Sequence, residues 1–164
     1  MNSEYKNRGY RKNHKKVGVE MSWLKSMMEK EPPEPQNPIG IVVIGNIEPD
    51  MHDTAKEAVR RSLKRAGFKT IDAGKSVAPQ VFVDKAKESM ADIIALSINT
   101  VPAKNNLAKL DEALKAAGMK GNVMIIMGGA AVKKEDADAI GALFGKNKEE
   151  GVEIAKKAMA GKKK

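Results

Sequence analysis

The chain has 164 residues, which is enough for one domain with a single hydrophobic core. It contains no cysteine, and this excludes disulfides, thiolate metal sites and cysteine nucleophiles. Because no apolar run approaches the ~20 residues that span a bilayer, and the amino terminus lacks the apolar segment of a signal peptide, we expect a soluble cytoplasmic protein with no membrane partner.

The net charge of +9 is concentrated at the two ends of the chain. Residues 1–16 carry six Lys or Arg and one Glu, and residues 156–164 carry five lysines and no acid. Between these segments the sequence is close to neutral. A nucleic-acid-binding domain is expected to carry its positive charge on the folded surface, so nucleic acid is not the expected partner.

Residues 1–38 are predicted to form a basic, flexible extension. One short helix is expected over 18–30, where Met21, Leu24 and Met28 recur at helical spacing. It packs on the domain or on a neighbouring chain, or it binds a partner. Four prolines within residues 32–38 forbid helix and favour a stiff extended linker. We expect the folded domain to occupy residues 39–160, followed by a basic tail at 161–164.

After residue 38 the pattern alternates between apolar, β-branched runs and amphipathic stretches. Alternation of this kind predicts a parallel sheet with helices on both faces, a five-stranded, doubly wound, flavodoxin-like or Rossmann-like α/β fold. Ligands of such folds bind beyond the carboxyl ends of the strands. Strands are expected over 39–44, 69–72, 92–96, 123–127 and 142–144, and helices over 54–66, 81–90, 104–117, 134–140 and 148–160.

The first loop at that edge, residues 45–53, holds the only histidine expected in the folded part, His52. A helix start with a capping box from Thr54 to Glu57 explains those two residues and the acidic Asp53 before them, but not the imidazole. A metal-binding imidazole needs an acceptor at its second nitrogen, and Asp50 is placed to supply one. One histidine without cysteine cannot build a closed zinc site, so a metal bound here would arrive with ligands of its own, as in a macrocycle.

The other loops at this edge carry small and hydroxyl-bearing residues. The run Gly74-Lys75-Ser76 does not complete a phosphate-binding loop, because position 69 is lysine. Ser97 ends the third strand, where a hydroxyl is commonly a turn former. Four small residues, 128–131, follow the fourth strand and would let a bulky group approach the backbone. Gly145 follows the fifth.

In order and spacing these residues resemble the cobalamin-binding domain family. That family carries D-x-H-x-x-G, then S-x-L, then G-G. Here Asp50-x-His52-x-x-Ala55 is followed after 41 residues by Ser97-x-Asn99 and, after 28 more, by Gly128-Gly129. The neighbouring sequence, including residues 66–68, 92–97 and 128–132, is similar to that of corrinoid proteins of methanogenic and acetogenic methyltransferase systems. The resemblance covers roughly residues 39–159.

The resemblance implies a role for each matching position. His52 would replace the dimethylbenzimidazole of cobalamin as the lower axial ligand of cobalt, and Asp50 would hold His52. Ser97 would hydrogen-bond the displaced nucleotide tail, and the glycine pair would line its slot. The full set of cofactor-binding candidates is Asp50, Met51, His52, Asp53, Ser97, Asn99, Thr100, Gly128, Gly129, Ala130 and Gly145, with His52 as the metal ligand; no residue is assigned a catalytic role.

The sequence departs from the family at two motif positions, Ala55 in place of glycine and Asn99 in place of leucine, and both are expected to alter the tail pocket. Thr100 is the nearest candidate for the hydroxyl that supports the His–Asp pair in some relatives. Methyltransferase corrinoid proteins usually carry a four-helix cap over the upper cobalt face, whereas residues 1–38 offer one short helix at most. We expect that face to be open or covered by another protein.

Three functions are compatible with these features. The first is a corrinoid protein that carries a methyl group on cobalt between barrel-type methyltransferase subunits, a carrier rather than a stand-alone enzyme. The second is the small cobalamin-binding subunit of an adenosylcobalamin-dependent mutase, whose large subunit would cover the upper face. The third is a non-catalytic domain with a degenerate cobalamin pocket. The oligomeric state cannot be read from the sequence.

Overall fold

The structure, a computed structural model, describes residues 30–162. Its contacts divide the chain into two units, Met1–Glu31 and Pro32–Lys164, and the fold described below belongs to the second. Most of the expected basic extension, with its helix over 18–30, lies outside the described residues, as do the last two lysines. No helix of the described residues is long and apolar enough to cross a membrane.

Five parallel strands form one sheet in the order β2-β1-β3-β4-β5. This is the order of flavodoxin-like folds, and it confirms the predicted doubly wound architecture. The chain reverses its winding direction between β1 and β3, which creates the switch point at which such folds bind ligands. The strands are β1 (Ile41–Ile47), β2 (Lys69–Val77), β3 (Ile93–Ser97), β4 (Met124–Gly128) and β5 (Leu143–Phe144).

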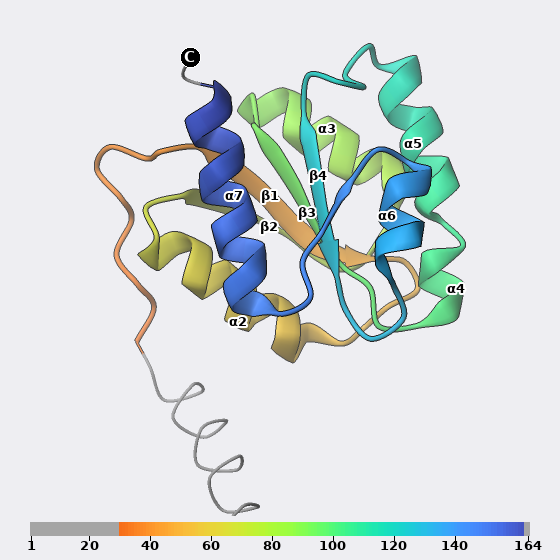
Figure 1. The fold of residues 1–164 in the computed structure, drawn as a ribbon, viewed down its shortest axis with the longest axis horizontal. Coiled ribbons are helices and arrows are strands. Elements are labelled where there is room, and N and C mark those ends of the chain that lie inside the picture. The colour runs from red at the N-terminus through yellow and green to blue at the C-terminus, as the bar shows by residue number, and fades with distance from the viewer. Residues whose placement is uncertain (1–29, 163–164) are drawn as a thin grey trace, which may run out of the picture. The chain divides into compact units, whose positions relative to one another are not determined.

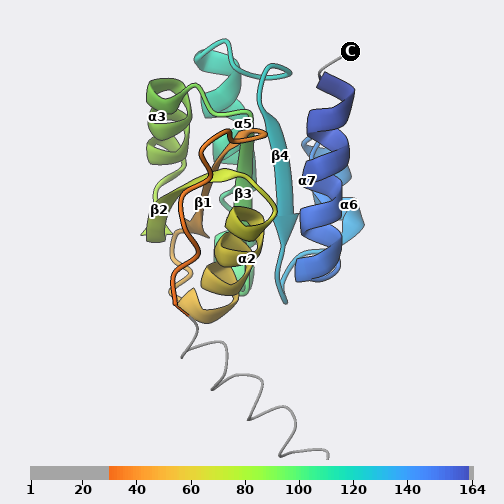
Figure 2. The same ribbon diagram turned by 90° about the vertical axis from the view of Figure 1, so that its left-hand side faces the viewer.

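Helices cover both faces of the sheet (Figure 1). Two of them, α2 (Asp53–Arg65) and α7 (Lys148–Lys162), share one face and pack on one apolar cluster with Ile44, Ile93 and Ile126. Figure 2 shows the strands between the two helical layers, with α3 to their left and α7 to their right. The opposite face is covered by α3 (Pro79–Ser89), α4 (Val101–Lys104), α5 (Leu107–Ala116) and α6 (Lys134–Ala139).

The apolar runs predicted as strands are buried on both sides, as a sheet between two helical layers requires. Every residue of β3 is buried, and so is β1 from Val42 to Ile47. Near the ends of these two strands, Asn46 in β1 and Ser97 in β3 are polar and buried, and they pair in the strand register. The sheet therefore places its polar groups at the carboxyl edge.

The second strand is longer than the sequence predicted. Residues 73–77, expected as a loop, continue β2 with two irregularities in the pairing: Ile44 pairs with Asp72, Gly45 with Gly74, and Ile47 with Val77. Backbone with positive φ at Gly74 and Ser76 accommodates these shifts. The apolar alternation that signals a strand is broken there, which explains why residues 73–77 were assigned to a loop.

Other predicted boundaries were also wrong. Strand β1, expected over 39–44, runs from Ile41 to Ile47. The helix expected over 104–117 is two helices, α4 and α5, separated at Asn105 and Asn106. Helix α2 begins at Asp53 with His52 as its N-cap and no side-chain capping bond, so the capping box at Thr54 does not form. Helix α7 continues through Lys162, which pairs with Asp92, so the tail expected to start at 161 is helical at its first two residues.

The proline-rich segment contains no helix or strand, and it packs on the domain. Pro32 is buried, and Glu34 Oε1 lies 2.6 Å from Lys64 Nζ on α2. The main-chain N–H of Ile39 donates to the carbonyl of Gly67. The compact unit therefore begins at Pro32, before the boundary expected after residue 38.

Candidate functional site

The centre of the site is a histidine–carboxylate pair in the loop between β1 and α2. His52 Nδ1 lies 2.7 Å from Asp50 Oδ1, and the main-chain N–H of His52 donates to the same oxygen. The Asp50 side chain is fully buried, whereas that of His52 is 66% exposed. Since the carboxylate occupies Nδ1, the geometry places the donor proton of a neutral imidazole there and leaves the Nε2 lone pair for a ligand.

Asp50 is held as an ionised acceptor by several N–H groups. Its Oδ2 accepts from the main-chain N–H of Asn99 at 2.7 Å and from Asn99 Nδ2 at 3.0 Å, and Asn46 Nδ2 lies 3.4 Å away. Burial raises the pKa of Asp50, but the hydrogen bonds from His52 and Asn99 outweigh it and bring the pKa below its ordinary value. Asp50 is therefore a carboxylate at neutral pH.

The loop that carries this pair is fixed from both neighbouring strands. Asn46 Nδ2 donates to the carbonyl of His52 at 3.1 Å. The irregular end of β2 supplies two more bonds, from Ser76 N to the carbonyl of Asp50 and from the N–H of Glu48 to the carbonyl of Val77. The extension of β2 thus explains how a loop with an exposed tip keeps His52 in place.

Asn99 joins the pair to the end of β3. Besides its two bonds to Asp50, its Nδ2 lies 3.2 Å from Ser97 Oγ, and its Oδ1 accepts from the main-chain N–H of Ala130 at 3.3 Å. The sequence predicted only that Asn99 would disturb the pocket. Instead, one amide contacts the carboxylate, the hydroxyl and the loop after β4.

Thr100 does not support the pair as the sequence suggested. Its Oγ1 is buried and has no hydrogen-bond partner among the described residues, whereas the amide of Asn99 occupies the carboxylate oxygen that a hydroxyl would have bonded. The segment after β3 is too short to bring Thr100 round to Asp50, because α4 begins at the next residue.

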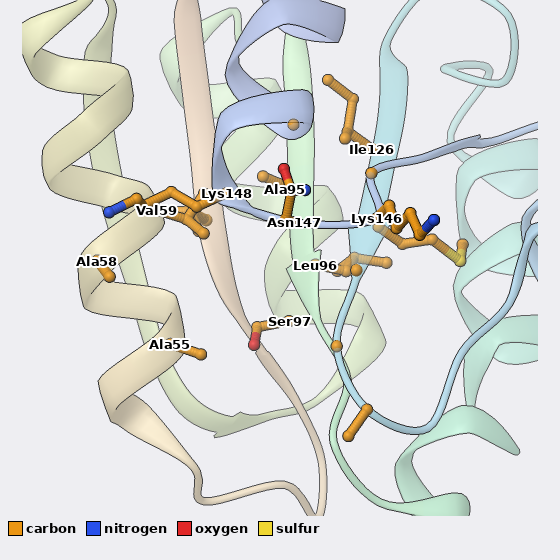
Figure 3. Close-up of a pocket in the computed structure, with 17 residues that line it drawn as sticks. Ala55, Ala58, Val59, Ala95, Leu96, Ser97, Ile126, Lys146, Asn147 and Lys148 are labelled. Carbon is orange, nitrogen blue, oxygen red and sulfur yellow. The ribbon is translucent and has the colours of Figure 1, made fainter. Parts of the chain in front are cut away.

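A cleft of about 520 Å³ opens between α2 and the segment that leads into α7 (Figure 3). Its floor is formed by Ile44, Ala95 and Ile126 from the three central strands. Figure 3 shows Ala55, Ala58 and Val59 of α2 along one side, with Ser97 facing them from the end of β3. The remaining lining residues are Leu96, Met127, Gly128, Gly129, Ala130, Gly145, Lys146, Asn147, Lys148 and Gly151.

Two glycines at the end of β4, Gly128 and Gly129, line the cleft where the backbone lies close to neighbouring segments. A Cβ at Gly128 would lie 2.9 Å from the carbonyl oxygen of Gly145, and a Cβ at Gly129 would lie 2.1 Å from that of Ile98. Gly129 also has φ +124°, a backbone conformation that other residues rarely adopt. The glycine pair is therefore required by the close approach of β4 to its neighbours as well as by the width of the cleft.

A buried lysine follows His52 by one helical turn. The side chain of Lys56 is 2% exposed, and its Nζ lies 2.8 Å from both Asp53 Oδ1 and Asp72 Oδ1. Burial lowers the pKa of Lys56, but its bonds to Asp53 and Asp72 outweigh this and raise the pKa above the ordinary value. Lys56 thus ties the start of α2 to β2, and with it the residue that caps the helix.

The structure brings most of the predicted residues together. Asp50, His52 and Asn99 form the pair and its support, and five of the others line the cleft: Ser97, Gly128, Gly129, Ala130 and Gly145. Met51 is 59% exposed beside His52, and Asp53 faces Lys56 rather than the cleft.

Sequence reasoning missed three contributors to the site. Asn46 was visible as an amide near the end of an apolar strand, and Ala58 and Val59 as residues at helical spacing from Ala55, which the motif had already pointed to. The segment 146–148 gave no signal, because only the fold brings it opposite α2.

Comparison with known proteins identifies the family and agrees with the fold. The sequence model of the family described as the B12 binding domain matches residues 40–155. This range includes the histidine loop, the end of β3, the glycine pair and the start of α7. The chain belongs to the B12 binding domain family. The family supports cobalamin as the cofactor of this chain, as the resemblance in motif spacing implied.

Corrinoid proteins of methanogens are among the curated relatives of this B12 binding domain. Trimethylamine corrinoid protein 2 of Methanosarcina acetivorans is 39% identical over 145 residues, which cover 88% of this chain. The same alignment covers 65% of the relative, so the chain spans less than two thirds of its length.

Solved structures agree. A cobalamin-binding protein from Desulfitobacterium hafniense is 31% identical with a TM-score of 0.70, covering 73% of this chain and 58% of that one. The methanol:cobalamin methyltransferase complex of Methanosarcina barkeri has a chain with a TM-score of 0.71 and 20% identity, covering 88% of this chain and 53% of that one. At that identity the second match supports the fold.

Proposed function

We propose that the chain binds a cobalt corrinoid with His52 as the lower axial ligand and the nucleotide tail in the cleft, and that it carries a methyl group between methyltransferase subunits. The observation that carries this proposal is the His52–Asp50 pair. The imidazole is exposed, its Nδ1 is occupied by a buried carboxylate, and Ala55, one turn further along α2, lines the cleft.

The donor set fits a corrinoid and no free metal ion. The described residues hold no group of three or more histidine, cysteine, aspartate or glutamate side chains that could hold a metal. A single imidazole would be enough to bind a metal that arrives with ligands of its own, as in a macrocycle. The second nitrogen of that imidazole is bonded to a carboxylate, the arrangement that orients a histidine ligand and raises its basicity.

The cleft fits the tail. Its volume of about 520 Å³ is within the ~300–1,000 Å³ of small-molecule sites, and its walls are small and apolar residues. Ser97 supplies a hydroxyl near the rim, and Lys146 and Lys148 supply positive charge near the start of α7. A degenerate pocket would be filled by protein side chains, and the open cleft supports a working one.

When bound, the cobalt of the corrinoid would supply the site that accepts and releases the methyl group. The residues of this chain would do the rest. His52 would bind from below, Asp50 would fix the imidazole and its tautomer, and the cleft would keep the displaced base out of water. The proposal assigns none of these residues the role of an acid, base or nucleophile.

The partners proposed for this carrier are barrel-type methyltransferase subunits. Support comes from the relatives, which are named as trimethylamine corrinoid proteins, and from the similar fold found in a methyltransferase complex. An adenosylcobalamin-dependent mutase subunit is the alternative that an experiment must separate from it.

The direct test is retention of the cofactor. The purified protein is mixed with hydroxocobalamin and passed through gel filtration, and the proposal predicts a coloured protein peak. A colourless peak would contradict corrinoid binding. In a second experiment the protein is loaded with either methylcobalamin or adenosylcobalamin and mixed with a purified methyltransferase and a thiol acceptor. A carrier transfers the methyl group of methylcobalamin to the thiol, whereas a mutase subunit supports no transfer.

A further inference from the structure

The residue at position 99 is where this chain departs from the S-x-L motif, and the structure gives that departure a role. Asn99 follows β3 by two residues and is half-buried between the histidine loop and the cleft. Its amide touches groups from three separate segments: Asp50 in the first loop, Ser97 at the end of β3, and Ala130 in the loop after β4. A leucine could make none of these bonds.

The orientation of the amide is fixed by its partners. The main-chain N–H of Ala130 can only donate, so the atom of Asn99 that faces it at 3.3 Å is Oδ1. The buried carboxylate of Asp50 can only accept, so it faces Nδ2 at 3.0 Å. The second hydrogen of Nδ2 is directed to Ser97 Oγ at 3.2 Å, and the amide thereby uses both of its hydrogens.

The bond to Ser97 determines what its hydroxyl can do. Because Ser97 Oγ accepts from Asn99, the hydroxyl hydrogen remains available to donate, and Ser97 lines the cleft. The hydroxyl oxygen of Ser97 and the carboxylate of Asp50 thus accept from the same donor, the Nδ2 group of Asn99. A displacement of either one moves the amide that holds the other.

We propose that Asn99 is a positioning residue that couples the tail cleft to the axial histidine, by orienting the Ser97 hydroxyl toward the tail and holding the Asp50 carboxylate under His52 with the same amide. The inference deepens the proposed function and rests on it. Entry of the tail, which contacts Ser97, would tighten the support of His52, and loss of the tail would loosen it. A leucine at this position would leave the two parts of the site independent.

The experiment compares cobalamin with cobinamide, which lacks the nucleotide tail, in four proteins: wild type, Asn99→Leu, Ser97→Ala and the double variant. We expect Asn99→Leu to weaken cobalamin binding by ~10-fold, as for a lost hydrogen bond to a charged group, and to weaken cobinamide binding less. Ser97→Ala is expected to weaken cobalamin binding in the wild-type background and to have little further effect beside Asn99→Leu, because residues that act as a unit are not additive.

A spectroscopic readout separates positioning from a general loss of structure. With cobalamin bound, Asn99→Leu is expected to shift the visible spectrum toward that of a corrinoid with a weakened lower ligand, while the circular dichroism of the ligand-free protein is unchanged. Asn122→Leu is the matched control, since the amide of Asn122 bonds only within its own exposed turn. If Asn99→Leu does not fold, Asn99→Ala, which removes the amide without added bulk, takes its place.

The outcomes are distinct. Additive losses for Ser97→Ala and Asn99→Leu, or equal losses with cobalamin and cobinamide, would overturn the coupling while leaving corrinoid binding intact. Absence of corrinoid binding by the wild type would instead overturn the proposed function itself. A coupled loss specific to cobalamin, with an altered spectrum, would support the inference.

Discussion

Asp50 Oδ1 lies 2.7 Å from His52 Nδ1 although the two side chains have opposite exposures, the carboxylate being fully buried and the imidazole open to solvent. A buried anion anchored by N–H groups from two loops serves as a rigid base for a ligand at the surface. The pair is thus preorganised before any cofactor binds. Predictions about the site follow from this asymmetry.

Replacing the anchor is expected to weaken the axial ligand without removing it. In Asp50→Asn the imidazole loses its carboxylate partner, and loss of such an outer-shell group typically costs ~10–100-fold in metal affinity. Titration of the visible spectrum with hydroxocobalamin measures the change. Asp84→Asn, at an exposed carboxylate on α3 that accepts from Gln80, is the control and should titrate like wild type.

The same variant has a signature in the ligand-free protein. Because the hydrogen bonds of Asp50 lower its pKa in the folded state, its contribution to the free energy of unfolding is complete above the ordinary carboxyl pKa of about 3.9 and is lost as the pH falls through the lower folded value. The difference in urea unfolding between wild type and Asp50→Asn should be constant near neutral pH and shrink below about pH 4. A difference that grows in acid would contradict this.

Filling the cleft should discriminate between corrinoids. Ala58 lines the cleft from α2, and the larger side chain of Ala58→Leu would occupy space assigned to the tail. We expect cobalamin affinity to fall by at least ~10-fold and cobinamide affinity to stay near wild type, since an overpacked site costs about 1–3 kcal/mol. Ala116→Leu, on the exposed side of α5, is the matched control. Equal losses for both corrinoids would place the tail elsewhere.

The glycine pair makes a prediction about stability. In Gly129→Ala the new Cβ would lie 2.1 Å from the Ile98 carbonyl oxygen in backbone of φ +124°, so the free energy of unfolding should fall by at least about 3 kcal/mol. Gly121 also has positive φ but nothing within 4 Å of a Cβ, so Gly121→Ala should cost only about 1–2 kcal/mol. Chemical denaturation measures both, and similar losses would show that the close approach at Gly129 relaxes freely.

The buried lysine should matter for the start of α2. Lys56→Met leaves Asp53 and Asp72 without their shared cation, but both carboxylates are more than one third exposed and can regain water, so we expect a loss of about 1–2 kcal/mol. Differential scanning calorimetry measures it. Lys115→Met, at an exposed lysine paired with Asp111, should leave the midpoint close to wild type. A Lys56→Met midpoint equal to that of Lys115→Met would deny Lys56 a structural role.

The order of strands and helices could be predicted because it depends on local pattern. Runs such as Ile41–Ile44 and Ile93–Leu96 are apolar on both sides, which only a sheet between two helical layers requires. The site could be predicted because the ends of parallel strands meet at one edge. His52, Ser97 and Gly128 are far apart in the chain but follow three neighbouring strands.

The remaining features depend on contacts that the local sequence does not record. The end of β2 looks like a loop, and its pairing is set by the histidine loop that it supports through Ser76. Lys56 on α2 and Asp72 on β2 are 16 residues apart in the chain, and only the fold brings them together. Asn99 was interpreted as a loss from the motif, because only the folded chain shows that its amide reaches Asp50 and Ser97 at once.

The central claim is that the imidazole of His52 binds the cobalt from below in place of the base of the cofactor. Electron paramagnetic resonance of the cobalt(II) form tests it most directly, with the protein uniformly labelled with ¹⁵N and the cobalamin unlabelled. A nitrogen ligand from the protein predicts doublet splitting of the cobalt lines, and reversion to an unsplit pattern in His52→Ala. Triplet splitting, the signature of the ¹⁴N base of the cofactor still bound to cobalt, would contradict the account.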